Sequence, residues 1–383
     1  MVAAVRAGLP MRAVARQFRV SLLTVQRWVQ RAGGRRLDRV DWRDRPHTPH
    51  RIRRTAPEVE ERVLRLRSTL RDTSDLGEFG AVAIRQALLE RGGSRVPAVR
   101  TIGRILERRG ALEGRRRVRR PPPPLGWYLP AVVAARVELD SFDIIDGLVI
   151  AGGTDVEVLT GLSLHGGLPA AWPSPPLRAA TIVELLLEHW RACGVPGYAQ
   201  FDNDTRFQGA HQFPDTLGRV SRLCLSLGVV PVFTPPRETG FQAAVESYNG
   251  RWQAKVWARF HHRTLPMLQT RSARYVAALR ARRAARIEAA PARRPFPALW
   301  RWDLQARPRG CMVFLRRTTD LGAVELLGHR WRVDRSWPHR LIRAEVDFDA
   351  TLMRFYGLRR HAPAEQRLLR QIRYVYPRQG FEG

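Results

Sequence analysis

The sequence has very little lysine, few cysteines and no long apolar run. Lys255 is the single lysine among 66 basic residues, so almost all of the positive charge is arginine. The three cysteines, Cys193, Cys224 and Cys311, form no Cys-x-x-Cys pair. This argues against a disulfide framework or a zinc site and is typical of a reducing cytoplasm. No stretch approaches the ~20 apolar residues of a membrane span, and the N-terminal segment lacks the apolar run of a signal peptide. We therefore expect a soluble cytoplasmic protein with no membrane partner.

Acidic residues are scarce relative to basic ones. The 383 residues carry 66 Lys and Arg against 35 Asp and Glu, which gives a formal net charge of +31. Such a surface repels itself unless a polyanion covers it, and nucleic acid is the usual polyanion. A basic scaffold or a membrane-surface protein would also carry this charge, and coding from GC-rich DNA would raise the arginine content without selection for binding. Nucleic acid is the partner that the charge favours.

Length and composition predict several folded domains. With 383 residues and 44% hydrophobic side chains, the chain can form two to four of them. A polar stretch after residue 34 and the basic, proline-rich tract Arg115–Pro124 lack hydrophobic periodicity and predict linkers. The predicted layout is a helical unit at 1–34, a linker at 35–56, a second helical, winged-helix-like unit at 57–113, a linker at 114–130, an α/β domain with a trailing helix at 131–300, a small β-barrel at 308–360 and a tail at 361–383.

The first helical unit has the pattern of a helix-turn-helix. Met11–Phe18 predicts one helix, with Val14, Ala15 and Phe18 on its inner side, and Ser21 can cap the next. Two residues separate the helices, which suits this motif. The side chains of the second helix that would reach bases and phosphates are Gln26, Arg27, Gln30 and Arg31. An ordinary helical hairpin with a polar face is the alternative.

The second helical unit contains three predicted helices, at 58–71, 80–91 and 97–109. Pro97 suits the first turn of the last helix, where Val99, Ile102 and Leu106 would face inward. The outward-facing residues that we expect to contact DNA are Arg100, Thr101 and Arg104. The N-terminal region is therefore predicted to bind DNA in two parts.

Downstream of the proline-rich tract the pattern becomes α/β and then β. The predicted elements are strands at 137–143, 148–151 and 156–164 with a tight turn at Asp146-Gly147, a helix at 178–193, a strand at 198–201, a helix at 213–227, a strand at 229–233, a helix from about 242 and a long helix near 271–289. Strands followed by alternating helices and strands indicate a mixed sheet. Five short strands between 311 and 356 suggest a small barrel, and the tail after Ala362 adds a short helix. The predicted fold class is multidomain α + α/β + β.

Three acidic residues of the α/β region carry the candidate chemistry. Asp140 lies within the first strand, where a half-buried carboxylate is unfavourable unless a positive group meets it. Asp202 stands where a strand ends, and such positions are where sites form in open α/β sheets. Glu246 lies in a helix that follows a Gly-containing loop. Carboxylate oxygens from these elements suit Mg²⁺ or Mn²⁺.

Four other acids are alternatives, namely Asp143, Asp155, Asp204 and Glu238. We expect Asp143 to share a strand face neither with Asp140 nor with the cluster that Asp140, Asp202 and Glu246 would form. Asp204 is the best substitute for Asp202.

The order and context of the three acids resemble the catalytic core shared by insertion-sequence transposases and retroviral integrases. The matching residues are Asp140, the run Asp202-Asn203-Asp204-Thr205-Arg206-Phe207, and the run Val245-Glu246-Ser247-Tyr248-Asn249. The resemblance covers about residues 130–265, and the two-part N-terminus and predicted barrel match the family's layout. It implies a ribonuclease-H-like core with a metal-holding triad of Asp140, Asp202 and Glu246.

Three features depart from the family pattern. Forty-three residues separate Asp202 from Glu246, a longer gap than is common, which we interpret as an insertion. Gly250 stands where relatives carry a basic or helix-favouring residue, and it softens the helix by ~1 kcal/mol. Position 253 is Gln where a basic residue is often found, so Arg251 or Lys255 would supply the DNA contact. The zinc-binding N-terminus of retroviral integrases is missing, which favours the insertion-sequence branch.

The resemblance implies the reaction and its partners. Two Mg²⁺ or Mn²⁺ ions would support cleavage at the 3′ end of a mobile element and strand transfer by in-line phosphoryl transfer. The expected partners are double-stranded DNA, as element ends and target, and further copies of the chain assembled on that DNA. The expected location is the bacterial cytoplasm, in association with the nucleoid. The rivals are a DNA-binding regulator with an inactive core, and a tyrosine recombinase using Tyr374 or Tyr376.

Overall fold

A computed structural model describes residues 1–43, 55–92, 96–112, 126–210, 213–360, 362–377 and 381. Residues 44–54 of the linker predicted at 35–56, and residues 114–125 of the linker predicted at 114–130, lie outside the described residues. The chain divides into two compact units, Met1–Glu60 and Glu61–Gly383. Within the described ranges, no helix is long and apolar enough to cross a membrane.

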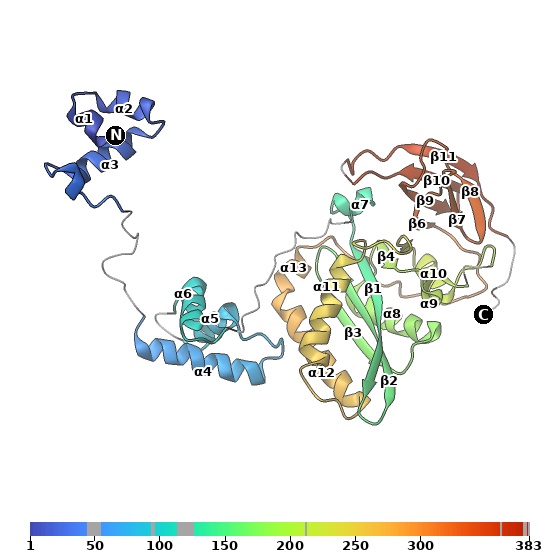
Figure 1. Cartoon of the computed structure of the whole chain (residues 1–383). Helices are drawn as coiled ribbons and strands as arrows, with labels where there is room; N and C mark the ends of the chain where they lie inside the picture. The colour runs from blue at the N-terminus through green and yellow to red at the C-terminus, as the bar shows by residue number, and fades with distance from the viewer. Residues whose placement is uncertain are drawn as a thin grey trace. The chain divides into compact units, whose positions relative to one another are not determined.

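The first unit is a small group of helices (Figure 1). Its elements are α1 (Val2–Arg6), α2 (Met11–Gln17), α3 (Leu22–Ala32) and the 3-10 turn η1 (Leu37–Arg39). The two helices predicted on either side of Arg19 and Val20 are present, and the Ser21 side chain accepts a hydrogen bond from the backbone N of Thr24 (3.2 Å) at the start of α3. Val14 and Val25 are buried between them, but Phe18, expected inside, is exposed because α2 ends one residue earlier. The sequence pattern did not predict α1.

Three further helices follow: α4 (Pro57–Thr73), which contains the boundary between the two units, α5 (Ala81–Glu90) and α6 (Val99–Arg108). They enclose an apolar cluster of Val63, Leu66, Ile84, Leu88, Ile102, Ile105 and Leu106. The predicted start of the last helix was wrong, because Ala98 is the N-cap and Pro97 lies outside the helix. Val99 is therefore the first helical residue and is 39% exposed, while Ile105 takes an inward position.

The rest of the unit is organised by one large mixed sheet (Figure 1). Its strands are β1 (Leu139–Ile150), β2 (Thr154–Ser163), β3 (Pro169–Ser174), β4 (Tyr198–Phe201), β5 (Val230–Phe233), β6 (Cys311–Arg317), β9 (Leu341–Asp347), β10 (Leu352–Gly357) and β11 (Leu368–Arg373). They are ordered β11-β10-β9-β6-β5-β4-β1-β2-β3, so the sheet is open, with β11 and β3 at its edges. The short strands β7 (Ala323–Leu326) and β8 (His329–Arg332) pair with each other.

The C-terminal strands do not form the separate barrel that the sequence suggested. β6 pairs in parallel with β5, through Val232↔Val313 and Phe233↔Phe314, and so continues the core sheet. The physical reason is that β6 is apolar on both faces: Met312 and Phe314 enter one core cluster, whereas Val313 enters another. A strand buried on both faces needs a neighbour on both edges, and here these are β5 and β9.

Two other local predictions need correction. Asp146-Gly147 is not a tight turn between two strands but an irregularity inside β1, where the register with β2 shifts between Ile145 and Leu148. Gly147 has a φ of 68° there, which suits a bulge. The tail forms the strand β11, antiparallel to β10, instead of a helix. The pattern also missed β3, whose two prolines are tolerated at a sheet edge.

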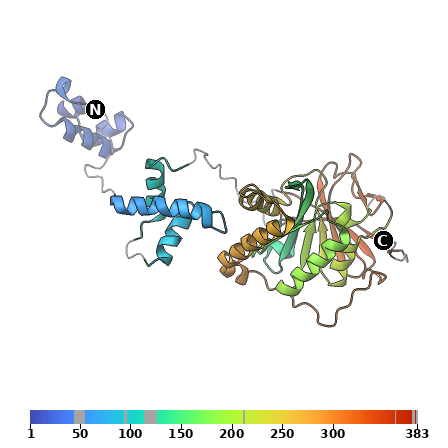
Figure 2. The same cartoon turned by 90° about the horizontal axis from the view of Figure 1, so that it is seen from below.

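Helices cover both faces of the core strands (Figures 1 and 2). α8 (Ala179–Cys193) and α10 (Arg219–Ser226) pack on the face that buries Phe142. α11 (Ala243–Trp252) and α12 (Leu265–Arg282) pack on the opposite face, which buries Ile145. The remaining short elements are α7 (Pro130–Val133), α9 (Thr205–Gln208), the π-helical turn η2 (Gln253–Trp257) and α13 (Ala284–Glu288). Alternate residues of β1 therefore face different helices.

Candidate active site

Strands β1 and β4 bring two aspartates side by side. The strands run parallel with the register Asp140↔Ala199 and Ser141↔Gln200. Asp202 follows the last residue of β4, and continuing the register by two residues places it beside Asp143. The carboxyl end of β4 is thus next to Asp143, not Asp140.

The alternation of side chains along β1 decides which aspartate faces Glu246. Successive residues of a strand point to opposite faces. Phe142 packs in the cluster that contains α8, and Ile145 packs in the cluster that contains α11 and α12. Asp140 therefore points to the same face of the sheet as Phe142, whereas Asp143 points to the same face as Ile145. Glu246 lies in the first turn of α11, so Asp143 is on the same side as Glu246.

Asp143 is held by the helix that carries Glu246. The Asn249 side chain donates from Nδ2 to Oδ2 of Asp143 (2.7 Å), and the Thr160 hydroxyl lies 2.7 Å from Oδ1 of Asn249. Burial, together with the charges of Asp202 and Glu246, raises the pKa of the Asp143 carboxyl to about 6. Asp143, Asp202 and Glu246 therefore form one electrostatically coupled group, which we call the acid cluster.

Asp202 is fixed by the loop that follows β4. Its Oδ1 accepts a hydrogen bond from the backbone N of Asp204 (3.0 Å), and burial is the main cause that raises the pKa of the Asp202 carboxyl. Asp204 instead caps α9 and binds Arg206, which also contacts Glu157. Burial would raise the pKa of Asp204, but the hydrogen bonds from Arg206 outweigh it and lower that pKa. Asp204 is already neutralised, which leaves Asp202 as the loop's member of the acid cluster.

Asp140 is placed elsewhere, contrary to the sequence-based prediction. Its side chain is 2% exposed and forms a bidentate ion pair with Arg293. In this pair Nη1 of Arg293 donates to Oδ1 of Asp140 at 2.9 Å. Trp190 on α8 donates its ring N–H to Oδ2 of Asp140 (3.2 Å). The adjacent His189 is buried, and burial lowers its pKa to about 4, although the Asp140 charge opposes this. The positive group that a buried carboxylate requires is therefore an arginine of this chain.

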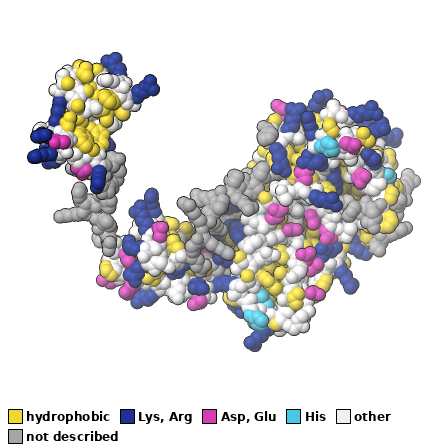
Figure 3. Space-filling model, viewed as in Figure 1, with side chains coloured by type: hydrophobic (Ala, Val, Ile, Leu, Met, Phe, Trp, Pro, Cys, Tyr) yellow, Lys and Arg dark blue, Asp and Glu magenta, His cyan; other side chains and the backbone are white. Residues whose placement is uncertain are grey.

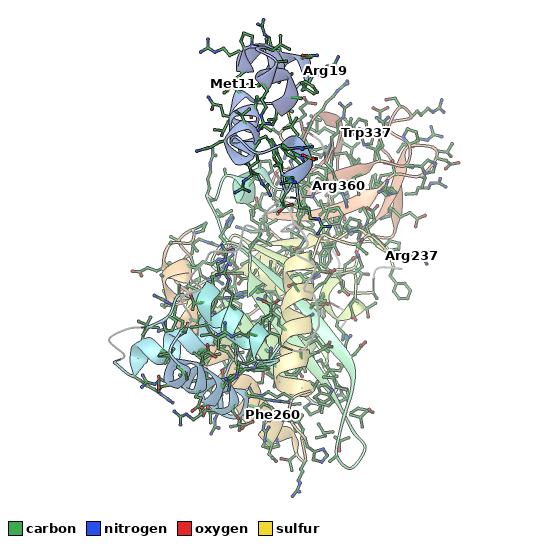
Figure 4. The ribbon with its side chains drawn as sticks, turned by 60° about the vertical axis from the view of Figure 1, so that its left-hand side comes forward. Met11, Arg19, Arg237, Phe260, Trp337 and Arg360 are labelled. Carbon is green, nitrogen blue, oxygen red and sulfur yellow. The ribbon has the colours of Figure 1, made fainter. Side chains whose placement is uncertain are left out.

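The remaining alternative acids do not join the acid cluster. Glu238 forms an ion pair with Arg317, and Asp155 is exposed at the start of β2. The loop of Glu238 precedes α11 and includes Arg237, labelled in Figure 4, whose φ of 59° is in the left-handed region.

The acid cluster has the donor chemistry of a Mg²⁺ or Mn²⁺ site. On the face shown in Figure 3, acidic side chains gather over the core and basic ones over the C-terminal strands. Among the residues that the structure describes, no three His, Cys, Asp or Glu side chains are close enough together to hold a metal ion as they stand. The oxygen donors of Asp143, Asp202 and Glu246 nevertheless fit such a cation, because the repulsion that raises the Asp143 pKa is the interaction that a cation would remove.

The predicted DNA contacts of the helical units differ in exposure. On α3, Gln26, Arg27 and Gln30 are exposed. Arg31 is not, because its guanidinium lies 4.9 Å from the centre of the Trp28 ring, binds the Arg43 carbonyl and is 3.7 Å from Asp41. Its side chain is only 14% exposed, so we remove it from the candidate contacts.

On α6, Arg100 and Arg104 are exposed and Thr101 is half-buried. On α11, the Arg251 side chain donates to the carbonyl of Ser247, one turn earlier (3.2 Å). Lys255, in η2, donates from Nζ to the Gly77 carbonyl (3.0 Å), so this ammonium is engaged within the protein. Arg251 is the better placed of the two for contact with a ligand that approaches Glu246.

The sequence pattern assigned no role to Asn249 and Thr160 at Asp143, or to Arg293 at Asp140. Asn249 was within reach, because it follows Glu246 by three residues and therefore lies on a neighbouring part of the same helix surface. Arg293 follows α13 and is far from Asp140 in the sequence. No local pattern indicates that pair.

Comparisons with known proteins give partial structural likenesses only. No family model matches the chain, and no curated protein matches it. The catalytic core domain of bovine immunodeficiency virus (BIV) integrase is 15% identical, over 37% of this chain and 82% of that one, with a TM-score of 0.28. The HTLV-2 integrase catalytic core domain, in complex with magnesium, is 11% identical over 37% and 84%, with a TM-score of 0.27. A chain of the simian T-cell lymphotropic virus intasome in complex with PP2A regulatory subunit B56 gamma is 13% identical over 77% and 96%, with a TM-score of 0.33.

Proposed function

We propose that this chain is a DNA transposase or integrase that cleaves and joins DNA strands at the acid cluster. The observation that carries the proposal is the coupling of Asp143 with Asp202 and Glu246, on β1, after β4 and on α11. The proposal replaces Asp140 by Asp143 in the triad. The net charge of +31 supports DNA as the substrate.

The chain's own residues prepare this cluster for a charged substrate. Asn249 orients Asp143, and the backbone N of Asp204 orients Asp202 (3.0 Å). Asn203 ties the same loop to β5 by donating to the Thr234 carbonyl (2.7 Å). When bound, one or two Mg²⁺ or Mn²⁺ ions would supply Lewis-acid stabilisation of the phosphate oxygens during phosphoryl transfer. Asp143, Asp202 and Glu246 would hold them.

The two helical units are the proposed recognition parts. The exposed side chains are Gln26, Arg27 and Gln30 on α3, and Arg100 and Arg104 on α6. Amide and guanidinium groups are suited to base edges and phosphates. We propose that α3 and α6 bind the element ends, and that further copies of the chain assemble on the same DNA.

The test is a cleavage assay with the full chain and labelled duplexes that carry the DNA flanking its coding region. We expect 3′-end nicks with Mg²⁺ or Mn²⁺ and none in EDTA, because the carboxylates alone cannot stabilise the charge that develops on the phosphate. A scrambled duplex of equal length is the control for sequence preference. If the flanking DNA is bound with preference but never cut with any divalent ion, the chain is a DNA-binding regulator and the proposal fails.

A further inference from the structure

A cleft of about 820 Å³ opens beside the loop that follows Asp202. Its walls come from α9 and its preceding loop on one side and from β6, β7 and β8 on the other. The residues that line it include Asn203, Gln208, Arg316, Val324, Leu326 and Leu327. This volume falls in the range of ~300–1,000 Å³ that is typical of sites for small molecules.

Arg316 brings an uncompensated positive charge to the cleft. Its guanidinium is buried, and it donates to the Thr234 carbonyl (3.0 Å) and to Oδ1 of Asn203 (2.7 Å). Burial lowers the pKa of Arg316 to about 9. Within the described part of the chain no carboxylate forms an ion pair with it. An anion arriving in the cleft would therefore be stabilised by a cation that the fold has left without a counter-charge.

Gln208 brings an unpartnered amide oxygen to the same cleft. The side chain is 3% exposed, and its buried Oε1 has no hydrogen-bond partner among the described residues. A buried acceptor without a partner is unfavourable by ~1–3 kcal/mol. An amide is also the side-chain group that pairs with the edge of a nucleobase.

The wall formed by β6, β7 and β8 combines apolar side chains with charged ones. Val324, Leu326 and Leu327 are almost fully buried and line the cleft. Arg317 is paired with Glu238, and His329 with Asp215. Glu325 and Arg330, which also line the cleft, lie opposite each other on β7 and β8. The cleft is therefore not a uniformly basic groove for a duplex, because among the described residues only Arg316, the Gln208 amide oxygen and the apolar side chains offer it unpaired groups.

We propose that the cleft binds a single unstacked nucleotide of the DNA strand, with its phosphate on Arg316, its base against Val324, Leu326 and Leu327, and its base edge on Gln208. This inference rests on the proposed function for the identity of the strand, because Asn203 links the cleft to the Asp202 loop. Pulling a base out of a duplex has a cost of a few kcal/mol, so a strand that is already single or frayed is the preferred ligand.

The test compares Gln208→Met in the full chain with wild type, in buffer with EDTA so that no cleavage contributes. The probes are a fluorescein-labelled ten-nucleotide single strand and an abasic strand with the same phosphates, and fluorescence anisotropy gives both affinities. We expect Gln208→Met to weaken binding of the base-containing strand about tenfold and to leave the abasic strand unaffected. Its thermal stability should match or exceed that of wild type, because the substitution removes the unpartnered amide oxygen.

Two more variants separate base contact from phosphate contact. Arg316→Gln should weaken the binding of both strands alike. It should also lower the salt dependence of that binding by the equivalent of about one phosphate contact. Gln371→Met, the same change on the exposed edge strand β11, is the matched control and should bind as wild type does. Equal affinity of wild type and Gln208→Met for the base-containing strand would overturn the inference. That result would leave the cleavage proposal standing, because the two are measured separately.

Discussion

Replacing Asp143 by asparagine is expected to abolish metal-dependent strand cleavage while the protein stays folded. The amide keeps the shape that Asn249 contacts but loses the charge that holds a cation. Loss of several kcal/mol of charge stabilisation corresponds to about a thousandfold or more in rate. The measurement is the initial rate of nicking of the end duplex with Mn²⁺, beside DNA affinity in EDTA.

The matched variant is Glu246→Gln, which should lose activity equally and bind DNA as wild type does. Asp143→Asn should not lower the melting temperature, because burial and two neighbouring carboxylates already disfavour the charge that it removes. An Asp143→Asn protein that still nicks DNA at the wild-type rate would exclude Asp143 from the triad.

Replacing Asp140 by asparagine is expected to lower the free energy of unfolding by about 3 kcal/mol or more. The substitution removes the counter-charge of Arg293 inside the fold, and breaking a buried ion pair from one side is strongly destabilising. Urea denaturation followed by tryptophan fluorescence measures the change in the full chain.

The double variant Asp140→Asn/Arg293→Met serves as the control for the pair. It should recover part of the lost stability, because no unpaired charge then remains. An Asp140→Asn protein with wild-type stability and no cleavage would instead show that Asp140 belongs to the site, as the sequence suggested.

The two aspartates show how far the sequence could predict the site. Periodicity located β4 at Tyr198–Phe201 and nearly the full length of α8, because short buried strands and amphipathic helices have strong local signals. The acids singled out from the sequence lie on β1, after β4 and on α11, which the structure brings together. The sequence could not say which aspartate of β1 faces Glu246, because that depends on the register with β4 and on which helix covers each face.

The C-terminal strands mark a second limit. The five strands expected between 311 and 356 are present as β6 to β10, since alternating apolar residues and turn residues are local features. Their sheet was not predicted, because the pairing of β5 with β6 joins residues about eighty positions apart. The apolar run in β6 was the available signal, since a strand buried on both faces belongs inside a sheet rather than in a small exposed one.

The central claim is that Asp143, with Asp202 and Glu246, holds the divalent cation. The most direct measurement is Mn²⁺ binding to the full chain, from the electron paramagnetic resonance signal of free Mn²⁺, for wild type, Asp143→Asn and Asp140→Asn at a temperature where all three are folded. We predict that wild type and Asp140→Asn bind Mn²⁺ with similar affinity and that Asp143→Asn binds it at least about tenfold more weakly. Unchanged Mn²⁺ affinity in Asp143→Asn, together with weakened binding in Asp140→Asn, would contradict the account.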